Sequence, residues 1–410
     1  MPITESDVSI VNQLKYDSSE DALQSVIKLF KTKYPSDPEA AAALATMLAA
    51  SGKFLAPLST TTADVASTGG PSSLSTLLSP LYLRAAGLLV PKLGVPGRPA
   101  GGIDCLAQLP GYKTVLKVDQ VFSILESGGY AHFLAQGELA PLDGRMFRLR
   151  QSLDAQKVPS LVAASLLAKK LAVGVKIAGL DIRVAHHGNF GENWEIATNN
   201  AILFEKTAEL LGIKAFPVLT DARHLYQPYI GRRESLVALH DFFENTSTEW
   251  LEEHCITCKS LALACIPEEL RFCAANATRS SLRQHFEQNL IDQGADPKDY
   301  HTLVTAAKMD HKHYLVAKHA GFCFYDISKL RNTLLQFHKT FGCYGEDFPD
   351  PVGINFTVRS GIYVESGTVL ASFRAPGKDI AEVSYELEKL ICDPKSTPYG
   401  QNIEAINGKK

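Results

Sequence analysis

From about residue 60 onward, stretches typical of β-strands alternate with stretches typical of α-helices. The predicted strands cover 89–91, 113–118, 175–184 and 215–219, and the predicted helices cover 74–88, 119–128, 160–173, 193–212 and 232–244. Alternation of this kind is typical of βαβ units, whose strands pair in parallel. We therefore expect an α/β fold in which a large domain contains a mixed, mainly parallel central sheet.

The regions on either side of this alternating part have different patterns. Residues 19–50 predict two helices, and residues 247–300 are helical with little strand signal. From about residue 312, short strands are expected at 313–320, 353–358, 362–363 and 368–373, followed by a helix over 379–391. The chain should therefore also contain a small helical domain and a C-terminal α+β part. We expect the tail, residues 394–410, to be loosely held.

Composition and charge limit the possible functions. The chain has 410 residues, 45% of them hydrophobic, which fits a globular protein of two or three domains. Its net charge of −3 comes from dispersed charges of both signs, and this argues against a nucleic-acid-binding surface. The chain has no apolar run of membrane-spanning length, and its polar N-terminus does not resemble a signal peptide. We expect a cytoplasmic protein with neither a nucleic-acid nor a membrane partner.

A group of cysteines has the spacing of a possible metal site. Cys255 and Cys258 follow His254 as half of a zinc site would, and Cys265 and Cys273 could complete it. The first three cysteines also recur at helical spacing together with leucine and alanine. We therefore interpret them as small apolar residues of a helix and expect no metal.

A Ser-Thr-Gly-Gly sequence, formed by Ser67, Thr68, Gly69 and Gly70, precedes the apolar helix predicted at 74–88. Glycine lets backbone N–H groups approach an anion closely, hydroxyl groups donate to it, and a helix N-terminus favours negative charge. Most isolated Gly-Gly sequences are plain turns. This one is expected beyond the carboxyl end of a strand, where α/β proteins bind ligands, and it is therefore a candidate phosphate site.

A second signal combines Arg150 with Ser165 and Lys169, which are four residues apart in a nearly apolar helix and so share one face. A buried hydroxyl and ammonium need a polar partner, and a planar base with carbonyl and ring N–H groups would supply it. Arg150 could add a forked pair of donors. The alternative is that Lys169 and Lys170 simply solvate the C-terminal turn of the helix and complement its dipole.

The order of these motifs resembles that of the thymidine/pyrimidine-nucleoside phosphorylases, almost to the C-terminus. The segments that carry the resemblance are Asp64 with 67–70, 91–92, 101–102, 109–112, Arg150, 164–170, 219–221 and 352–370. The resemblance implies a homodimer in which a small helical domain binds the base and a larger α/β domain binds phosphate. It also implies reversible phosphorolysis of a pyrimidine nucleoside, with phosphate as the co-substrate and no other cofactor.

The resemblance assigns roles to individual residues. Arg150, Ser165 and Lys169 match the pyrimidine-binding positions. The phosphate-binding positions are Ser67, Thr68, Gly69, Gly70, Thr76 and Lys92. The small domain would comprise residues 1–58 and 146–174, the α/β domain 59–145 and 175–310, and the C-terminal α+β part 311–410.

The chain also departs from this family at the phosphate site. Val65 stands where the family has a phosphate-binding lysine, and Ala66 stands where it has a histidine beside the pyrimidine. Ser72 and Ser73 replace a Gly-Asp pair, a phosphate-binding serine is absent, and Ile103 replaces a threonine. Each charge-assisted contact contributes roughly 1.5–3 kcal/mol, so phosphate binding should be weaker unless other groups compensate.

Four residues are candidates for that compensation. His186 and His187 follow the strand predicted at 175–184, and with Arg183 they could form a cationic or acid–base centre. Arg98, in the altered loop, is the fourth candidate and is added to the phosphate-binding set. The alternative for the two histidines is an ordinary solvated loop.

Three functions remain open at this point. The first is pentosyl transfer or phosphorolysis of a pyrimidine nucleoside with altered phosphate use. The second is a non-catalytic or regulatory homologue that binds a nucleobase or nucleotide. The third is a phosphoribosyl diphosphate-dependent transferase. Such enzymes usually need acidic residues to hold magnesium. Ser73 stands in place of an acidic residue here, and this argues against the third function.

Overall fold

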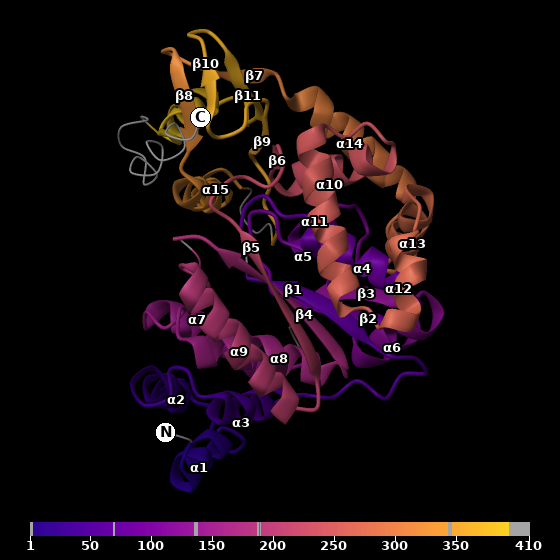
Figure 1. Ribbon diagram of the computed structural model, residues 1–410, viewed down its shortest axis with the longest axis vertical. Helices are drawn as coiled ribbons and strands as arrows, with labels where there is room; N and C mark the ends of the chain where they lie inside the picture. Colours follow the sequence, from indigo (N-terminus) through magenta and orange to yellow (C-terminus); the bar gives the residue numbers. More distant parts are fainter. Residues whose placement is uncertain are drawn as a thin grey trace, which may run out of the picture.

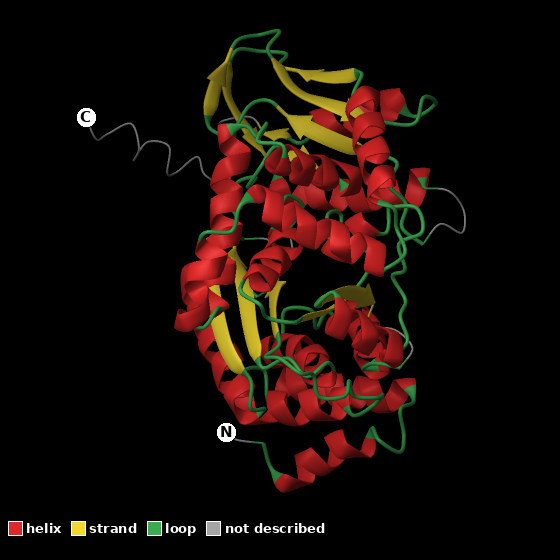
Figure 2. Ribbon diagram, turned by 90° about the vertical axis from the view of Figure 1, so that its right-hand side faces the viewer, coloured by secondary structure: helices red, strands yellow, loops and turns green. Residues whose placement is uncertain are grey.

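The computed structural model describes residues 3–68, 70–134, 138–186, 188, 190–342 and 347–392. The first helices and the C-terminal strands lie at opposite ends of the molecule, with the central sheet between them (Figure 1, Figure 2). Within the described residues, no helix combines the length and the apolar character that crossing a membrane requires.

The central sheet is built from parallel strands. Its main part has the order β1-β4-β5, with β1 at Ala63–Ser67, β4 at Ile177–Val184 and β5 at Lys214–Asp221. A second parallel pair joins β2 at Val90–Gly94 to β3 at Tyr130–Leu134, and a parallel bridge from Thr62 to Leu89 connects it to β1. The predicted α/β class and the mainly parallel central sheet are therefore confirmed.

One face of the sheet is covered by helices that continue into the N-terminal part. These helices are α1 (Glu5–Gln13), α2 (Glu20–Thr32), α3 (Pro38–Ala49), α7 (Pro141–Ser152), α8 (Pro159–Ala172) and α9 (Trp194–Leu210). The alanine-rich α3 packs on α8 and α9, and α9 packs on β4 and β5. The two helices predicted within residues 19–50 are α2 and α3, and each begins at a side-chain cap, Ser19 or Asp37.

The opposite face carries a second helical layer (Figure 1). Its helices are α4 (Ser75–Ala85), α5 (Gly102–Leu106), α10 (Arg232–Phe243), α11 (Glu249–Cys265), α12 (Glu268–Ala275), α13 (Arg279–Asp292) and α14 (Pro297–Asp310). α6 (Val118–Ser127) packs on β2 and β3, and its buried residues belong to the same core cluster as those of α8 and α9. α4 packs on β1, and α11 packs on both α4 and β4. The helical character predicted for 247–300 is confirmed.

The C-terminal part consists of antiparallel strands and two helices, of which the sequence predicted the second but not the first. One sheet has the order β6-β9-β11-β7, with β6 at Tyr229–Ile230, β7 at His313–Val316, β9 at Gly353–Phe356 and β11 at Val369–Arg374. A smaller sheet contains β8 (Gly321–Tyr325), β10 (Ile362–Val364) and β12 (Ile391–Cys392). The helices are α15 (Ile327–Phe341) and α16 (Ile380–Glu388). The expected loose tail lies outside the described residues.

One strand prediction is wrong. Residues 113–117 form no strand, and Val118 already begins α6. The strand of this region is β3, whose residues follow two glycines, and Leu134 at its end donates to the carbonyl of Thr114. Lys113 is held instead by the carbonyl of Gln293 at the end of α13. Tertiary packing thus overrides the β-propensity of this stretch.

The cysteine-rich segment lies in α11 and the helix that follows. Cys255, Cys258 and Cys265 are buried in α11, whereas Cys273 is exposed on α12. His254 is also buried, and its Nε2 accepts a hydrogen bond of 2.8 Å from the backbone N–H of Leu74, just before α4. Burial lowers the pKa of His254 to about 3, so the neutral ring serves as this acceptor. The described residues contain no group of three side chains placed to hold a metal.

Candidate functional site

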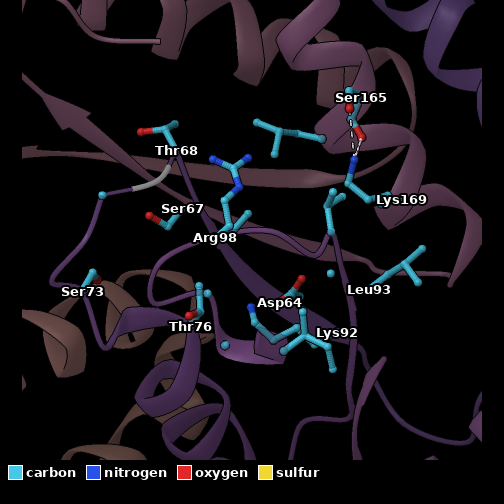
Figure 3. A pocket seen from close by; sticks show the side chains of 18 of the residues that line it. Asp64, Ser67, Thr68, Ser73, Thr76, Lys92, Leu93, Arg98, Ser165 and Lys169 are labelled. Atoms are coloured by element: carbon cyan, nitrogen blue, oxygen red, sulfur yellow. Dashed lines mark hydrogen bonds and ion pairs between the residues drawn. The ribbon is translucent and has the colours of Figure 1, made fainter. Parts of the chain in front are cut away.

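A cavity of about 170 Å³ lies at the carboxyl ends of β1, β2 and β4 (Figure 3). Parallel strands bring their carboxyl ends to one edge of the sheet, which explains why residues far apart in sequence meet there. The predicted site residues that line it are Ser67, Thr68, Gly70, Thr76, Lys92, Arg98, Arg150, Ser165, Lys169 and Arg183. The cavity therefore brings together the two halves that the sequence motifs indicated.

The predicted histidine pair does not join this group. His186 does not line the cavity, and its side chain is 92% exposed, with Nδ1 at 3.8 Å from a carboxylate oxygen of Glu192. This placement fits the solvated-loop alternative. His187 and Gly69 lie outside the described residues.

Three donors face the cavity without a hydrogen bond or ion pair among the described residues. They are the hydroxyl of Thr76 and the guanidinium groups of Arg98 and Arg331. The Arg98 side chain lies 5.7 Å from the ring centroid of Phe147, and in Figure 3 it stands between Thr68 and Ser165. Unpaired guanidinium groups beside hydroxyl groups are the donors that phosphate oxygens require.

Arg183 is a third guanidinium on this wall. Its Nε donates to Asp181 at 3.1 Å, and its side chain lies over the Tyr226 ring at 5.2 Å. Burial lowers the pKa of Arg98, and the neighbouring charges of Arg331 and Arg183 lower it further. The charge of Asp104 partly opposes these effects on the pKa of Arg98. Gly70, with φ of +130°, lies directly against Arg183, where a Cβ atom would clash.

A buried ion pair holds the loop that carries Arg98. Oδ1 of Asp104 accepts from the backbone N–H of Gly97 at 2.8 Å and from Arg232 at 3.0 Å. Its other oxygen accepts from the N–H of Arg98 at 3.2 Å, and Arg232 also donates to the Arg98 carbonyl. Asp104 and Arg232 are buried, so the backbone of the loop is fixed while the Arg98 side chain points into the cavity.

Lys92 is not a free phosphate ligand, because it binds a buried carboxylate. Its Nζ lies 2.7 Å from Oδ1 of Asp64 and 2.6 Å from the carbonyl of Val65, while Lys170 pairs with the other oxygen of Asp64. Burial opposes ionisation of Asp64, but the charges of Lys170 and Lys92 outweigh it and lower its pKa to about 2. Two ammonium groups on one carboxylate leave this wall of the cavity with net positive charge.

Alternation along β1 explains why Val65 and Ala66 differ. Asp64 and Ala66 line the cavity, whereas Val65 is 1% exposed and packs in the core on the other side of the strand. The position of the family's lysine therefore faces the core here, so the cations at this site come from other elements.

Ser165 and Lys169 lie together on α8, as their spacing predicted. Nζ of Lys169 is 3.1 Å from Oγ of Ser165 and 2.5 Å from Oδ2 of Asp143 on α7. Both Lys169 and Lys170 are buried, so the alternative in which they solvate the end of α8 is wrong. Burial lowers the pKa of Lys169, and the charge of Asp143 opposes this effect.

Arg150 binds the backbone between α7 and α8. Its three side-chain nitrogens donate to the carbonyls of Ala155, Leu161 and Gln156 at 3.3, 3.1 and 3.0 Å. Burial lowers the pKa of Arg150 to about 10. These contacts give Arg150 a structural function, and they leave Ser165 and Lys169 as the side chains of the helical half best placed to meet a base.

Sequence reasoning missed Arg331 and Asp143. Arg331 belongs to α15 of the C-terminal part, and nothing local in its sequence indicates that α15 reaches the cavity. Asp143 precedes Arg150 by seven residues, which is two helical turns, so both lie on the face of α7 that packs toward α8. The seven-residue spacing between Asp143 and Arg150 could therefore have identified Asp143 as the partner of Lys169.

The fold has known counterparts, although no family model matches the chain. Anthranilate phosphoribosyltransferase from Thermus thermophilus superimposes with a TM-score of 0.50 over 75% of this chain and 95% of that one, at 13% identity. The chain has an anthranilate phosphoribosyltransferase-like fold. A variant of the enzyme of that name from Saccharomyces cerevisiae, with magnesium bound, has a TM-score of 0.47 at 13% identity, over 70% of this chain and 91% of that one. The narrower resemblance to pyrimidine-nucleoside phosphorylases stays a prediction.

Proposed function

We propose that this protein is a pentosyltransferase that moves a pentosyl group between a nitrogen base and a phosphate-bearing partner. The observation that carries the proposal is the set of donors in one cavity. Among the described residues, Arg98, Arg331 and Thr76 present donors with no hydrogen bond or ion pair, and Ser165 and Lys169 line the same cavity. The anthranilate phosphoribosyltransferase-like fold is consistent with this class of reaction.

The cavity offers the two stabilising functions that such a transfer needs. Breaking an N-glycosidic bond produces an electron-poor pentosyl centre and leaves negative charge on the departing group. The guanidinium groups of Arg98 and Arg331 would hold the phosphate oxygens beside the sugar. The ammonium of Lys169 and the hydroxyl of Ser165 would stabilise charge on the base.

The arginines supply the compensation that the altered phosphate site requires. The family's lysine position is Val65 in the core, yet Arg183 lines the cavity together with two guanidinium groups that have no hydrogen bond or ion pair among the described residues. We therefore propose that the phosphate is bound mainly by arginine, and that the base is a pyrimidine or a related ring held by Ser165 and Lys169. The residues are proposed to work in a homodimer in the cytoplasm, without a further cofactor.

A phosphoribosyl diphosphate-dependent transfer is the second candidate. Arg98 and Arg331, together with the excess positive charge of Lys92 and Lys170 on Asp64, match more negative charge than a single phosphate carries. The residues present do not fit a magnesium site, because both oxygens of Asp64 are bound by lysines and Ser73 bonds Ser75. In this version of the proposal, arginine side chains balance the charge of the diphosphate.

Release of free base distinguishes these functions. A panel of thymidine, uridine and cytidine is incubated with and without phosphate, and free base is measured by chromatography. A parallel panel combines free bases with phosphoribosyl diphosphate and follows the formation of nucleotide. Turnover in either panel supports pentosyl transfer, and binding by calorimetry without turnover in both favours the non-catalytic binding homologue.

A further inference from the structure

A smaller cavity adjoins the main one and shares part of its wall. It measures about 30 Å³, and both cavities are lined by Thr68, Gly70, Arg183 and Arg331. A single water needs roughly 10–15 Å³, so this second chamber has room for more than one ligand atom. Ser72 and Ile327 belong to its remaining wall. Arg183 and Arg331 therefore stand between two adjoining spaces.

Arg331 has an unusual environment for an arginine. It follows Ile327, the first residue of α15, by one helical turn, and α15 lies between the C-terminal strands and the central sheet (Figure 1). Its side chain is partly buried, and burial lowers its pKa. Among the described residues its guanidinium has no hydrogen bond or ion pair. Removing a cation from water without a partner is unfavourable, and a bound anion would restore the balance.

The neighbouring Arg98 is in a similarly unfavourable environment in the absence of an anion. Arg331 acts on Arg98 as a like charge, and so does Arg183. Asp181 binds Arg183, and the charge of Asp104 acts favourably on Arg98. Within the described residues, however, no carboxylate forms a direct ion pair with the Arg98 or Arg331 side chain. Like charges that converge on a cavity are a feature of sites that bind several negative charges.

We propose that the two chambers bind two phosphoryl groups at once, one held by Arg98 and Thr76 in the main cavity and one held by Arg331 and Arg183 at the second chamber. The C-terminal part would thereby complete the site and select a diphosphorylated ligand over inorganic phosphate. This inference rests on the proposed function only for the identity of the pentosyl group. Two kinds of ligand would place phosphoryl groups in both chambers. One is a diphosphate, and the other is a pentose phosphate bound together with inorganic phosphate.

Binding calorimetry on the full chain tests the inference with diphosphate, inorganic phosphate, and ribose 5-phosphate with and without inorganic phosphate as probes. Arg331→Met, which keeps the apolar stem, should weaken diphosphate binding about 10- to 100-fold and change inorganic phosphate binding by less than about threefold. Arg331→Lys should recover part of the loss. Lys339→Ala, which removes an exposed cation from the same helix, is the matched control and should change neither affinity.

Several outcomes would overturn the inference. Unchanged diphosphate binding in Arg331→Met, or an equal loss for phosphate and diphosphate, would show that Arg331 does not provide a second phosphoryl position. The ribose 5-phosphate measurements separate the two sources, because cooperative binding with phosphate supports a pentose phosphate and a preference for diphosphate alone supports a diphosphate. If no base is released or transferred but the effect of Arg331→Met holds, the proposed function fails and this inference stands. Thermal unfolding of each variant confirms that it is folded.

Discussion

Nζ of Lys169 lies 2.5 Å from Oδ2 of Asp143, and both side chains are buried between α7 and α8. Removing one member of a buried pair leaves the other charge without compensation, which costs about 3–5 kcal/mol. Lys169→Ala should therefore lower the free energy of unfolding by about that amount, measured by urea unfolding.

A double variant separates the structural and binding functions of Lys169. Lys169→Met combined with Asp143→Leu removes both charges and should recover much of the lost stability. If it does so and still binds no base, Lys169 contacts the base directly. Base binding at the original affinity in the folded double variant would contradict that contact.

The acid stability of the protein should depend on Asp64. The pKa of Asp64 is about 2 in the folded protein, against an ordinary value of 3.8. Because the folded-state value is lower, its stabilising contribution is complete above about pH 4 and is lost as pH falls toward 2. Asp64→Asn should reduce the loss of stability between pH 4 and pH 2 by about 2 kcal/mol, measured by chemical unfolding at each pH. An unchanged slope would contradict the pairing with Lys92 and Lys170; the exposed Asp310→Asn serves as control.

Adjacent residues of β1 should respond differently to the side chains of the phosphorylase family. Val65→Lys places an ammonium in the core and should destabilise the protein by several kcal/mol, or prevent folding. Ala66→His changes a residue that lines the cavity and should leave the unfolding midpoint nearly unchanged. Thermal unfolding of both variants checks the assignment of faces. Equal stability of the two variants would mean that Val65 does not face the core.

Much of the α/β framework follows from the sequence, because β4, β5 and their helices are long and strongly patterned. β3 was missed because the strand of this region was predicted at 113–118 instead, and tertiary packing rather than local propensity decides between the two stretches. Lys169 was found from its spacing to Ser165, Thr76 from the family resemblance and Arg98 from its place in the altered loop, and all three line one cavity. Arg331 could not be found in this way, because its place depends on how the C-terminal part packs on the sheet.

The fixed loop that carries Arg98 gives a further prediction. Asp104→Asn keeps the shape of the side chain but weakens its bonds to Arg232 and to the loop backbone. The affinity for diphosphate should fall about tenfold, measured by calorimetry, because Arg98 is no longer held in place. Asp221→Asn changes an exposed carboxylate outside the main cavity and is the control. Equal affinities of Asp104→Asn and the unaltered protein would contradict a positioning function.

The most direct measurement of the central claim is the rate of base release or base transfer in the unaltered protein and in Arg98→Met. If arginine binds the phosphate, turnover should require phosphate or phosphoribosyl diphosphate. In folded Arg98→Met the rate should fall at least about 100-fold, because two or more charge-assisted contacts are lost. Turnover that needs no phosphate-bearing compound, or that is the same in Arg98→Met, would contradict it.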